Sequence, residues 1–374
     1  MSDVLDPRSR ASDPRLTLGR QRLSVIDCDI HPQVADKDEI IQFMPERWRD
    51  YARTFGGLYR QALADTLSHP RMAPEVSRND AWPPKGSPGS DLQFMRDQHL
   101  DPNNIDYGML MPLNRGPANQ RNLDFGAAMC NAVNQWQIEY WLEREPRLRG
   151  SIVIAHDDAP AAIKEIELRA KDKRFVQIMM PPHSLEPLGR RKYWPVYEAA
   201  QAHGLPIALH VSGINGYAST GSGSPSYYIE EHHTNVRGMQ GLITSLVLEG
   251  VFEKFPGMRF VLVEGGLAWA PALKWRLDKH FLRFRSEVPH LQRMPSEYVR
   301  DHIWFTTQPL DEPDRDSDLA EVLQMIGCDR VMFSTDYPHW DFDDPRFVLG
   351  KLALSDADKG LIFAGNARKL YGLP

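Results

Sequence analysis

The sequence predicts an α/β protein, specifically a distorted (β/α)8 barrel of the TIM type with an insertion after its first strand. Eight short apolar segments recur along the 374 residues, and their near-continuous apolar character is typical of parallel strands covered on both faces. Helical patterns separate most of them, and that alternation favours a barrel. The eight segments are 23–26, 107–113, 150–155, 175–180, 205–211, 259–264, 303–307 and 330–336.

The intervening segments carry helical periodicity and recognisable ends. Gly204 ends one predicted helix just before the fifth strand, and Ser355 with Asp358 forms a capping pair at the start of the last helix. No strand is followed by a glycine-rich phosphate-binding motif, which argues against a dinucleotide-binding sheet. The predicted helices are 159–170, 194–203, 239–255, 320–326 and 355–371.

The predicted domain organisation follows from the places where the regular alternation of strands and helices is interrupted. Residues 1–22 are polar and predict a surface arm, and residues 23–374 form the barrel. The interval 32–105 is far longer than an ordinary strand-to-helix connection. An insertion there lies over the carboxyl-terminal mouth of a barrel, so it is either a cap over the site or an arm that contacts a second subunit.

Composition excludes several classes of partner. The formal net charge of −6 argues against non-specific binding to nucleic acid, and no apolar run approaches the length of a membrane span. The polar N-terminal residues do not resemble a signal peptide. The three cysteines (Cys28, Cys130 and Cys328) are widely spaced, which predicts reduced thiols in a cytoplasmic protein. With nucleic acid and membrane disfavoured, the expected partner is a small-molecule substrate.

Polar side chains end four of the predicted strands. Asp29 and His31 lie two residues apart and therefore face the same side of the first strand. The carboxyl ends of barrel strands converge, so a mixture of imidazoles and carboxylates meets at one mouth. Such a set, without thiolates, suits one divalent ion, Zn²⁺ or Mn²⁺. The full set is Asp29, His31, His210, Glu264 and Asp336.

Each of these residues also has an ordinary structural interpretation. A lone histidine such as His210 is more often hydrogen-bonded in a core than bound to metal, and Asp29 or Asp336 alone could belong to a turn. Glu264 is harder to explain, because a carboxylate that ends the apolar run 260–263 needs a partner. Taken together, polar residues at four strand ends favour a metal site.

Four motifs carry a family resemblance over roughly residues 24–373: Asp27-Cys-Asp-Ile-His31, Pro206-Ile-Ala-Leu-His210, Phe260-Val-Leu-Val-Glu-Gly-Gly266 and Phe333-Ser-Thr-Asp-Tyr-Pro-His339. In order and spacing they resemble the aminocarboxymuconate-semialdehyde decarboxylase group of the amidohydrolase superfamily. The resemblance implies one divalent metal held by Asp29, His31, His210 and Asp336, and a homodimer. It also implies a non-oxidative decarboxylase of a small aromatic or unsaturated carboxylic acid.

Glu264 departs from the family pattern, because the well-known decarboxylases carry a catalytic histidine at that position. Glu264 is therefore expected either to carry the proton in place of the histidine or to join the metal ligands. The expected catalytic residues are Asp336, Glu264 and His210. The same ligands would also serve a hydrolase that attacks an amide, lactone or ester with metal-activated water, and a third possibility is a binding protein without activity.

Residues beyond the ligand set are predicted to contact the substrate because they follow strand ends or lie in adjacent polar loops. They are Asn114, Arg115, His183, His233, His339 and Trp340.

Overall fold

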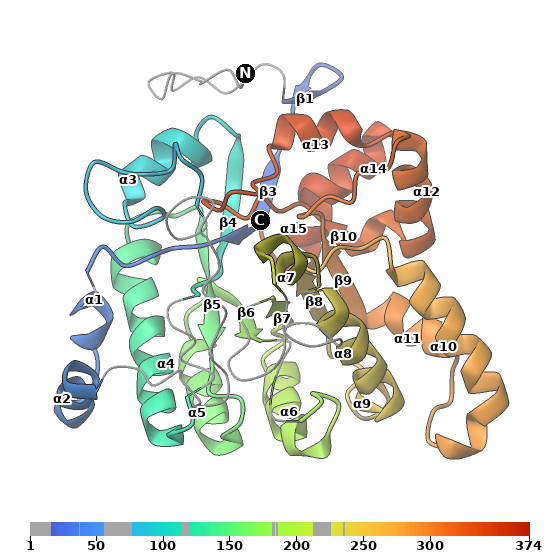
Figure 1. Cartoon of the computed structure of the whole chain (residues 1–374), viewed down its shortest axis with the longest axis horizontal. Helices are drawn as coiled ribbons and strands as arrows, with labels where there is room; N and C mark the ends of the chain where they lie inside the picture. The colour runs from blue at the N-terminus through green and yellow to red at the C-terminus, as the bar shows by residue number, and fades with distance from the viewer. Residues whose placement is uncertain are drawn as a thin grey trace.

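Eight parallel strands surrounded by helices form a nearly closed barrel, which confirms the predicted fold class (Figure 1). The computed structural model describes residues 16–36, 38–55, 77–113, 120–181, 184, 186–211, 226–234 and 236–374. The strands follow one another around the sheet in chain order. They are β3 (Val25–Ile30), β4 (Ile105–Leu110), β5 (Leu148–Val153), β6 (Phe175–Met180), β7 (Ile207–His210), β8 (Phe260–Val263), β9 (Ile303–Thr306) and β10 (Val331–Met332).

The distortion of the barrel is concentrated between its first and last strands. β10 has only two residues, and it pairs with β9. Backbone contacts join this end to β3: the Cys28 amide donates to the Phe333 carbonyl at 3.0 Å, and Ile30 forms an isolated bridge with Tyr337. The loop that follows β10 is thereby attached to the strand that carries Asp29.

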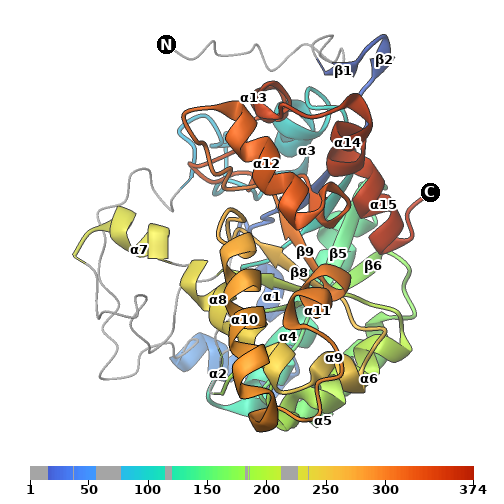
Figure 2. The same cartoon turned by 90° about the vertical axis from the view of Figure 1, so that its right-hand side faces the viewer.

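Helices pack on the outside of the strands, with α8, α10 and α11 outside β8 and β9 (Figure 2). Most of the predicted helices begin and end close to the expected residues, and α5 begins at a side-chain cap, Asp158, which accepts from the Ala161 amide. The outer helices are α4 (Leu123–Gln137), η4 (Ile138–Leu142), α5 (Ala159–Arg169), η5 (Arg191–Tyr193), α6 (Trp194–Ala202), α7 (Tyr228–Thr234), α8 (Val236–Leu248), α9 (Val251–Lys254), α10 (Ala270–Phe284), η6 (Arg285–Glu287), α11 (Pro295–His302), α12 (Asp316–Ile326), η7 (Cys328–Arg330), α13 (Pro345–Lys351), α14 (Asp356–Gly360), η8 (Leu361–Gly365) and α15 (Asn366–Tyr371).

The prediction of one continuous helix over 239–255 was wrong. Gly250 adopts a left-handed conformation with φ of +79° and separates α8 from α9. A residue with a side chain rarely adopts this conformation, so glycine allows the chain to turn between the two helices. Among the described helices, none is both long and apolar enough to span a bilayer.

The described part of the 32–105 interval contains α1 (Asp38–Ile41), α2 (Glu46–Phe55), α3 (Leu92–Met95) and η2 (Arg96–Leu100). α1 packs against α4, whereas other residues of the interval contact the loops that follow β3 and β10. The Gln33 amide donates to the Gly89 carbonyl at 2.9 Å, and the Arg78 amide donates to the Pro338 carbonyl at 3.0 Å. Residues 77–91 therefore lie beside the carboxyl-terminal mouth, although their role as a cap stays a prediction.

The expected arm at the N-terminus contains a small hairpin in its described part. β1 (Thr17–Leu18) pairs antiparallel with β2 (Gln21–Arg22), and the side chain of Leu16 is buried in the core. Apolar contact at Leu16 therefore attaches this end of the hairpin to the barrel.

An ion-pair network anchors η2 to the turn before β5. The carboxylate of Glu145 accepts from Arg96 Nε at 2.7 Å and from Arg147 Nε at 2.9 Å. Burial alone would raise the pKa of Glu145, but the hydrogen bonds from Arg147 and Arg96 outweigh burial and lower its pKa to about 2.

We expect this network to make stability depend on pH in the acidic range. A carboxylate whose pKa is lower in the folded protein stabilises it fully above the ordinary pKa of 4.5, and that stabilisation is lost as the pH falls towards 2. Urea unfolding at neutral pH should show Glu145→Gln to be less stable than the wild type by roughly 1–2 kcal/mol, allowing for solvent screening. This difference should shrink as the pH falls from 4.5 to 2, and a constant difference would contradict the prediction.

Candidate metal centre

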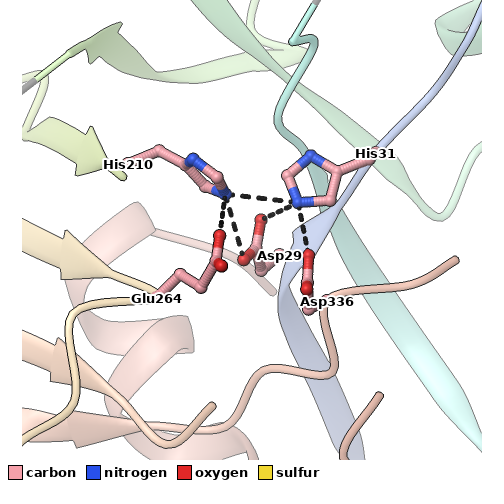
Figure 3. Close-up of side chains that lie close together, drawn as sticks. All are labelled: Asp29, His31, His210, Glu264 and Asp336. Carbon is pink, nitrogen blue, oxygen red and sulfur yellow. Dashed lines mark hydrogen bonds and ion pairs between the residues drawn. The ribbon is translucent and has the colours of Figure 1, made fainter. Parts of the chain in front are cut away.

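Five side chains from four strand ends converge at the carboxyl-terminal mouth of the barrel (Figure 3). Asp29 lies in β3 with His31 just beyond it, and His210 ends β7. Glu264 follows β8, and Asp336 lies in the loop after β10. One potential ligand atom from each residue lies within 4.8 Å of those of the other four, and all five residues are buried.

The two imidazoles direct their Nε2 atoms towards the same point. His31 Nε2 lies 3.2 Å from His210 Nε2 and 2.7 Å from Asp336 Oδ1. His210 Nε2 lies 3.1 Å from Glu264 Oε2, and Asp29 Oδ1 lies 3.2 Å from His31 Nε2. The Nδ1 of His31 donates to the Met111 carbonyl at 2.7 Å, so in the neutral tautomer its Nε2 lone pair faces the cluster.

This arrangement fits one divalent cation. Both carboxylate oxygens of Asp29 are buried and lack a hydrogen-bond donor of good geometry within the described part of the chain. Buried carboxylate oxygens in that state are unfavourable unless a positive charge compensates them. Two imidazole nitrogens with carboxylate oxygens and no thiolate form a donor set suited to Zn²⁺ or Mn²⁺.

The electrostatics of the cluster show an excess of negative charge. Burial is the largest effect on Glu264, and with the nearby Asp336 carboxylate it raises the pKa of Glu264 to about 7 despite the opposing effect of His210. Burial and then Asp341 also raise the pKa of Asp336 well above its ordinary value. A cation between these groups would favour their ionised forms.

The backbone is strained at two of the five residues of the cluster, Glu264 and Asp336. Glu264 has φ of +57° and Asp336 has φ of +62°, and both are non-glycine residues in the left-handed region. This conformation costs of order 1–3 kcal/mol and persists where the surroundings determine it, most often at functional sites. The turn at each position directs the carboxylate towards the cluster rather than along the strand.

Asp27 lies next to the cluster and forms hydrogen bonds with the segments that carry Asp29 and Asp336. One oxygen of its buried carboxylate accepts from the Asp29 amide at 3.1 Å and from the Thr335 amide at 3.0 Å. The other accepts from Thr335 Oγ1 at 2.5 Å and pairs with His99 Nε2 at 2.8 Å. Asp27 therefore joins β3 directly to the segment that carries Asp336.

The sequence prediction missed Asp27 as a positioning residue. The signal available in the sequence was its spacing: Asp27, Asp29 and His31 follow one another at intervals of two residues, and residues two apart face the same side of a strand. His99 and Thr335, the partners of Asp27, carried no sequence signal of their own.

Of the predicted substrate-contact residues, one lies against the cluster, two lie on or against α7, and three fall outside the described residues. His339 lies against the cluster, with its Nδ1 2.6 Å from Asp336 Oδ1 and its ring stacked on His31 at 4.4 Å. Trp340 packs on His232 with ring centroids 5.3 Å apart, and His233 is exposed on α7. Asn114, Arg115 and His183 lie outside the described residues.

Three further residues at the mouth were absent from the predicted site. His232 on α7 lies 3.1 Å from Asp341 Oδ2 through its Nε2. Gln308, which follows β9, donates from Nε2 to Asp341 Oδ2 at 2.9 Å and to Asp336 Oδ2 at 3.4 Å. Asp341 follows Asp336 by five residues, and that proximity was the only sequence signal for it.

We expect Asp27→Ala to destabilise the protein and weaken metal binding together. The substitution leaves buried donors of Asp29, Thr335 and His99 without an acceptor, which should cost about 3–5 kcal/mol in urea unfolding. Loss of a residue that positions a ligand should also weaken Mn²⁺ affinity about 10- to 100-fold by calorimetric titration. Asp27→Asn keeps one acceptor oxygen and should show a smaller loss in both; unchanged Mn²⁺ affinity in Asp27→Ala would contradict this role.

Comparison with known proteins identifies the family of this chain. The amidohydrolase family model Amidohydro_2 matches residues 26–373. A gamma-resorcylate decarboxylase from Polaromonas sp. (strain JS666 / ATCC BAA-500) is 27% identical over 305 residues, which cover 78% of this chain and 91% of that protein.

Two solved structures share the fold. The 5-carboxyvanillate decarboxylase from Sphingomonas paucimobilis superposes with a TM-score of 0.69 at 20% identity, covering 94% of this chain and 100% of that one. The dihydroxybenzoic acid decarboxylase from Polaromonas sp. JS666, solved with manganese and 2-nitroresorcinol, gives a TM-score of 0.64 at 21% identity, covering 94% and 97%. The family predicted from the motifs is therefore confirmed, and the chain belongs to the amidohydrolase family.

Proposed function

We propose that this protein is a non-oxidative decarboxylase of a small hydroxylated aromatic acid that depends on one catalytic divalent metal ion. The observation that carries the proposal is the buried group of Asp29, His31, His210, Glu264 and Asp336 at the mouth of an amidohydrolase-family barrel. Relatives over most of the chain are gamma-resorcylate decarboxylases, which supports the reaction class.

Manganese is the metal we propose. A structural neighbour carries manganese, and three of the five candidate donors here are carboxylates, which suit a hard ion better than a three-histidine set would. Asp29, His31, His210 and Asp336 are the proposed ligands. When bound, such an ion stabilises negative charge on the carboxylate and neighbouring hydroxyl of the substrate.

Glu264 is proposed to complete the metal shell rather than to carry the proton. Its Oε2 lies 3.1 Å from His210 Nε2, the same atom that faces His31 Nε2 at 3.2 Å. The carboxylate therefore points at the centre of the ligand set.

Asp336 is then the proposed proton carrier. It delivers a proton to the ring carbon that bears the carboxylate; the bond to the carboxylate carbon then breaks, its electron pair restores the aromatic ring, and CO₂ leaves. The proton is replaced from solvent. His339 donates from Nδ1 to Asp336 Oδ1 at 2.6 Å and acts as a positioning residue that orients this carboxylate.

The remaining features of the proposal concern the surroundings of the site. The described segment 77–91 lies against the loops that hold His31 and His339, which supports a cap that keeps water from the reacting carbon. We further propose a homodimer in the cytoplasm, as the sequence predicts.

Direct assay of the reaction tests the proposal. The manganese-loaded protein is incubated with a panel that includes 2,6-dihydroxybenzoate and 5-carboxyvanillate, and CO₂ and the phenolic product are measured. We expect release of one CO₂ per product molecule and loss of activity on chelation that Mn²⁺ restores. No release from any acid of the panel, together with turnover of an amide or lactone, would replace the decarboxylase with the hydrolase.

His339 provides a test of the proton-transfer step. We expect His339→Ala to lower kcat about 10- to 100-fold while KM changes little and Mn²⁺ stays bound, because Asp336 loses the hydrogen bond that orients it whereas the proposed ligands Asp29, His31 and His210 are unaltered. His339→Asn keeps a donor near the Nδ1 position and should recover a large part of kcat. Equal kcat in the two variants would contradict the positioning role.

A further inference from the structure

A second group of potential metal ligands lies beside the first and shares one residue with it. His232, Glu264 and Asp341 each offer a ligand atom within 4.8 Å of the other two. His232 comes from α7, Glu264 follows β8, and Asp341 lies in the loop after β10. We propose that these residues form a second divalent-cation site, with Glu264 as the ligand common to both sites.

The geometry of His232 and Asp341 suits shared coordination. Their facing atoms, Nε2 and Oδ2, lie 3.1 Å apart. This resembles the 3.1 Å between His210 Nε2 and Glu264 Oε2 in the first group. The ring of Trp340 packs on His232 with centroids 5.3 Å apart and limits where the imidazole can lie.

The balance of charge favours a second cation. Four carboxylates gather at this mouth, from Asp29, Glu264, Asp336 and Asp341, and each is at most 11% exposed. Ion pairs join each of these four carboxylates to a histidine. One divalent ion offsets two of the four negative charges that these carboxylates carry when ionised, and a second ion would favour the ionised form of all four in this buried setting.

A neutral oxygen beside the group provides an independent indication. Gln308 is fully buried, and its amide group lies against Asp336 and Asp341, to which Nε2 donates at 3.4 Å and 2.9 Å. Its Oε1 is buried and has no hydrogen-bond partner in the described part of the chain. A side-chain amide oxygen is a ligand that hard divalent ions accept, and rotation of the Gln308 amide about its last bond would present Oε1 in place of Nε2 to a cation beside Asp341.

A shared carboxylate explains why glutamate stands at position 264. Glu264 belongs to both groups, and a carboxylate has two oxygens with which to contact two cations. Paired metal ions joined in this way stabilise negative charge on two oxygens of a bound substrate. The second site would therefore take a substrate that carries an additional anionic oxygen next to the reacting carboxylate.

Manganese binding provides the test, and it depends on the proposed first site but not on catalysis. The full chain is stripped of metal and saturated with Mn²⁺, the bound metal is counted by elemental analysis after gel filtration, and the electron paramagnetic resonance spectrum is recorded. We expect two Mn²⁺ per chain with a spectrum of two interacting ions. We expect one Mn²⁺ and a single-ion spectrum in His232→Gln and in Asp341→Asn.

His233→Gln is the matched control, because this neighbouring residue is exposed on the same helix and lies outside both groups. It should retain two ions, and circular dichroism confirms that each variant is folded. Wild type that saturates at one Mn²⁺ would overturn the second site and leave the proposed decarboxylase intact. Two Mn²⁺ in both His232→Gln and Asp341→Asn would overturn the assignment of these ligands, whereas a wild type without any bound Mn²⁺ would contradict the proposed function itself.

Discussion

The burial of several carboxylates beside two imidazoles is the constraint on which the rest of this structure depends. Asp29, Glu264 and Asp336 are removed from water, and neither oxygen of Asp29 finds a hydrogen-bond donor of good geometry in the described part of the chain. Such a cluster is unfavourable as an empty assembly and favourable around a cation. The cluster lies at the mouth of the barrel because the ends of the parallel strands bring residues from distant parts of the sequence together there.

The seam between β3 and β10 holds this arrangement in place. β10 is short, so regular strand pairing contributes little there. Asp27 supplies the missing connection, because its carboxylate binds the amides of both Asp29 and Thr335. Asp27 therefore helps to join the first and last strands and also positions the ligands that they carry. Fold stability and metal binding should consequently change together when this seam is altered.

The repeated apolar segments were sufficient to predict the barrel, because a strand covered on both faces leaves an unmistakable run of aliphatic residues. Strand order and strand-end geometry then placed Asp29, His31, His210, Glu264 and Asp336 together before any coordinates. The break at Gly250 was not predicted, since a glycine inside a helical pattern does not by itself show a left-handed turn. Asp341 and Gln308 were missed, and His233 was chosen over its neighbour His232, because α7 and the loops after β9 and β10 carry no periodicity that orients their side chains.

Anomalous diffraction at the manganese edge, from crystals of the protein grown with Mn²⁺, would show directly whether these side chains hold a metal ion. We expect a strong peak about 2.0–2.6 Å from oxygens of Asp29 and Asp336 and from Nε2 of His31 and His210. The absence of a peak among these four side chains at saturating Mn²⁺ would contradict this expectation. In that case the carboxylates would be stabilised by protons and histidines alone.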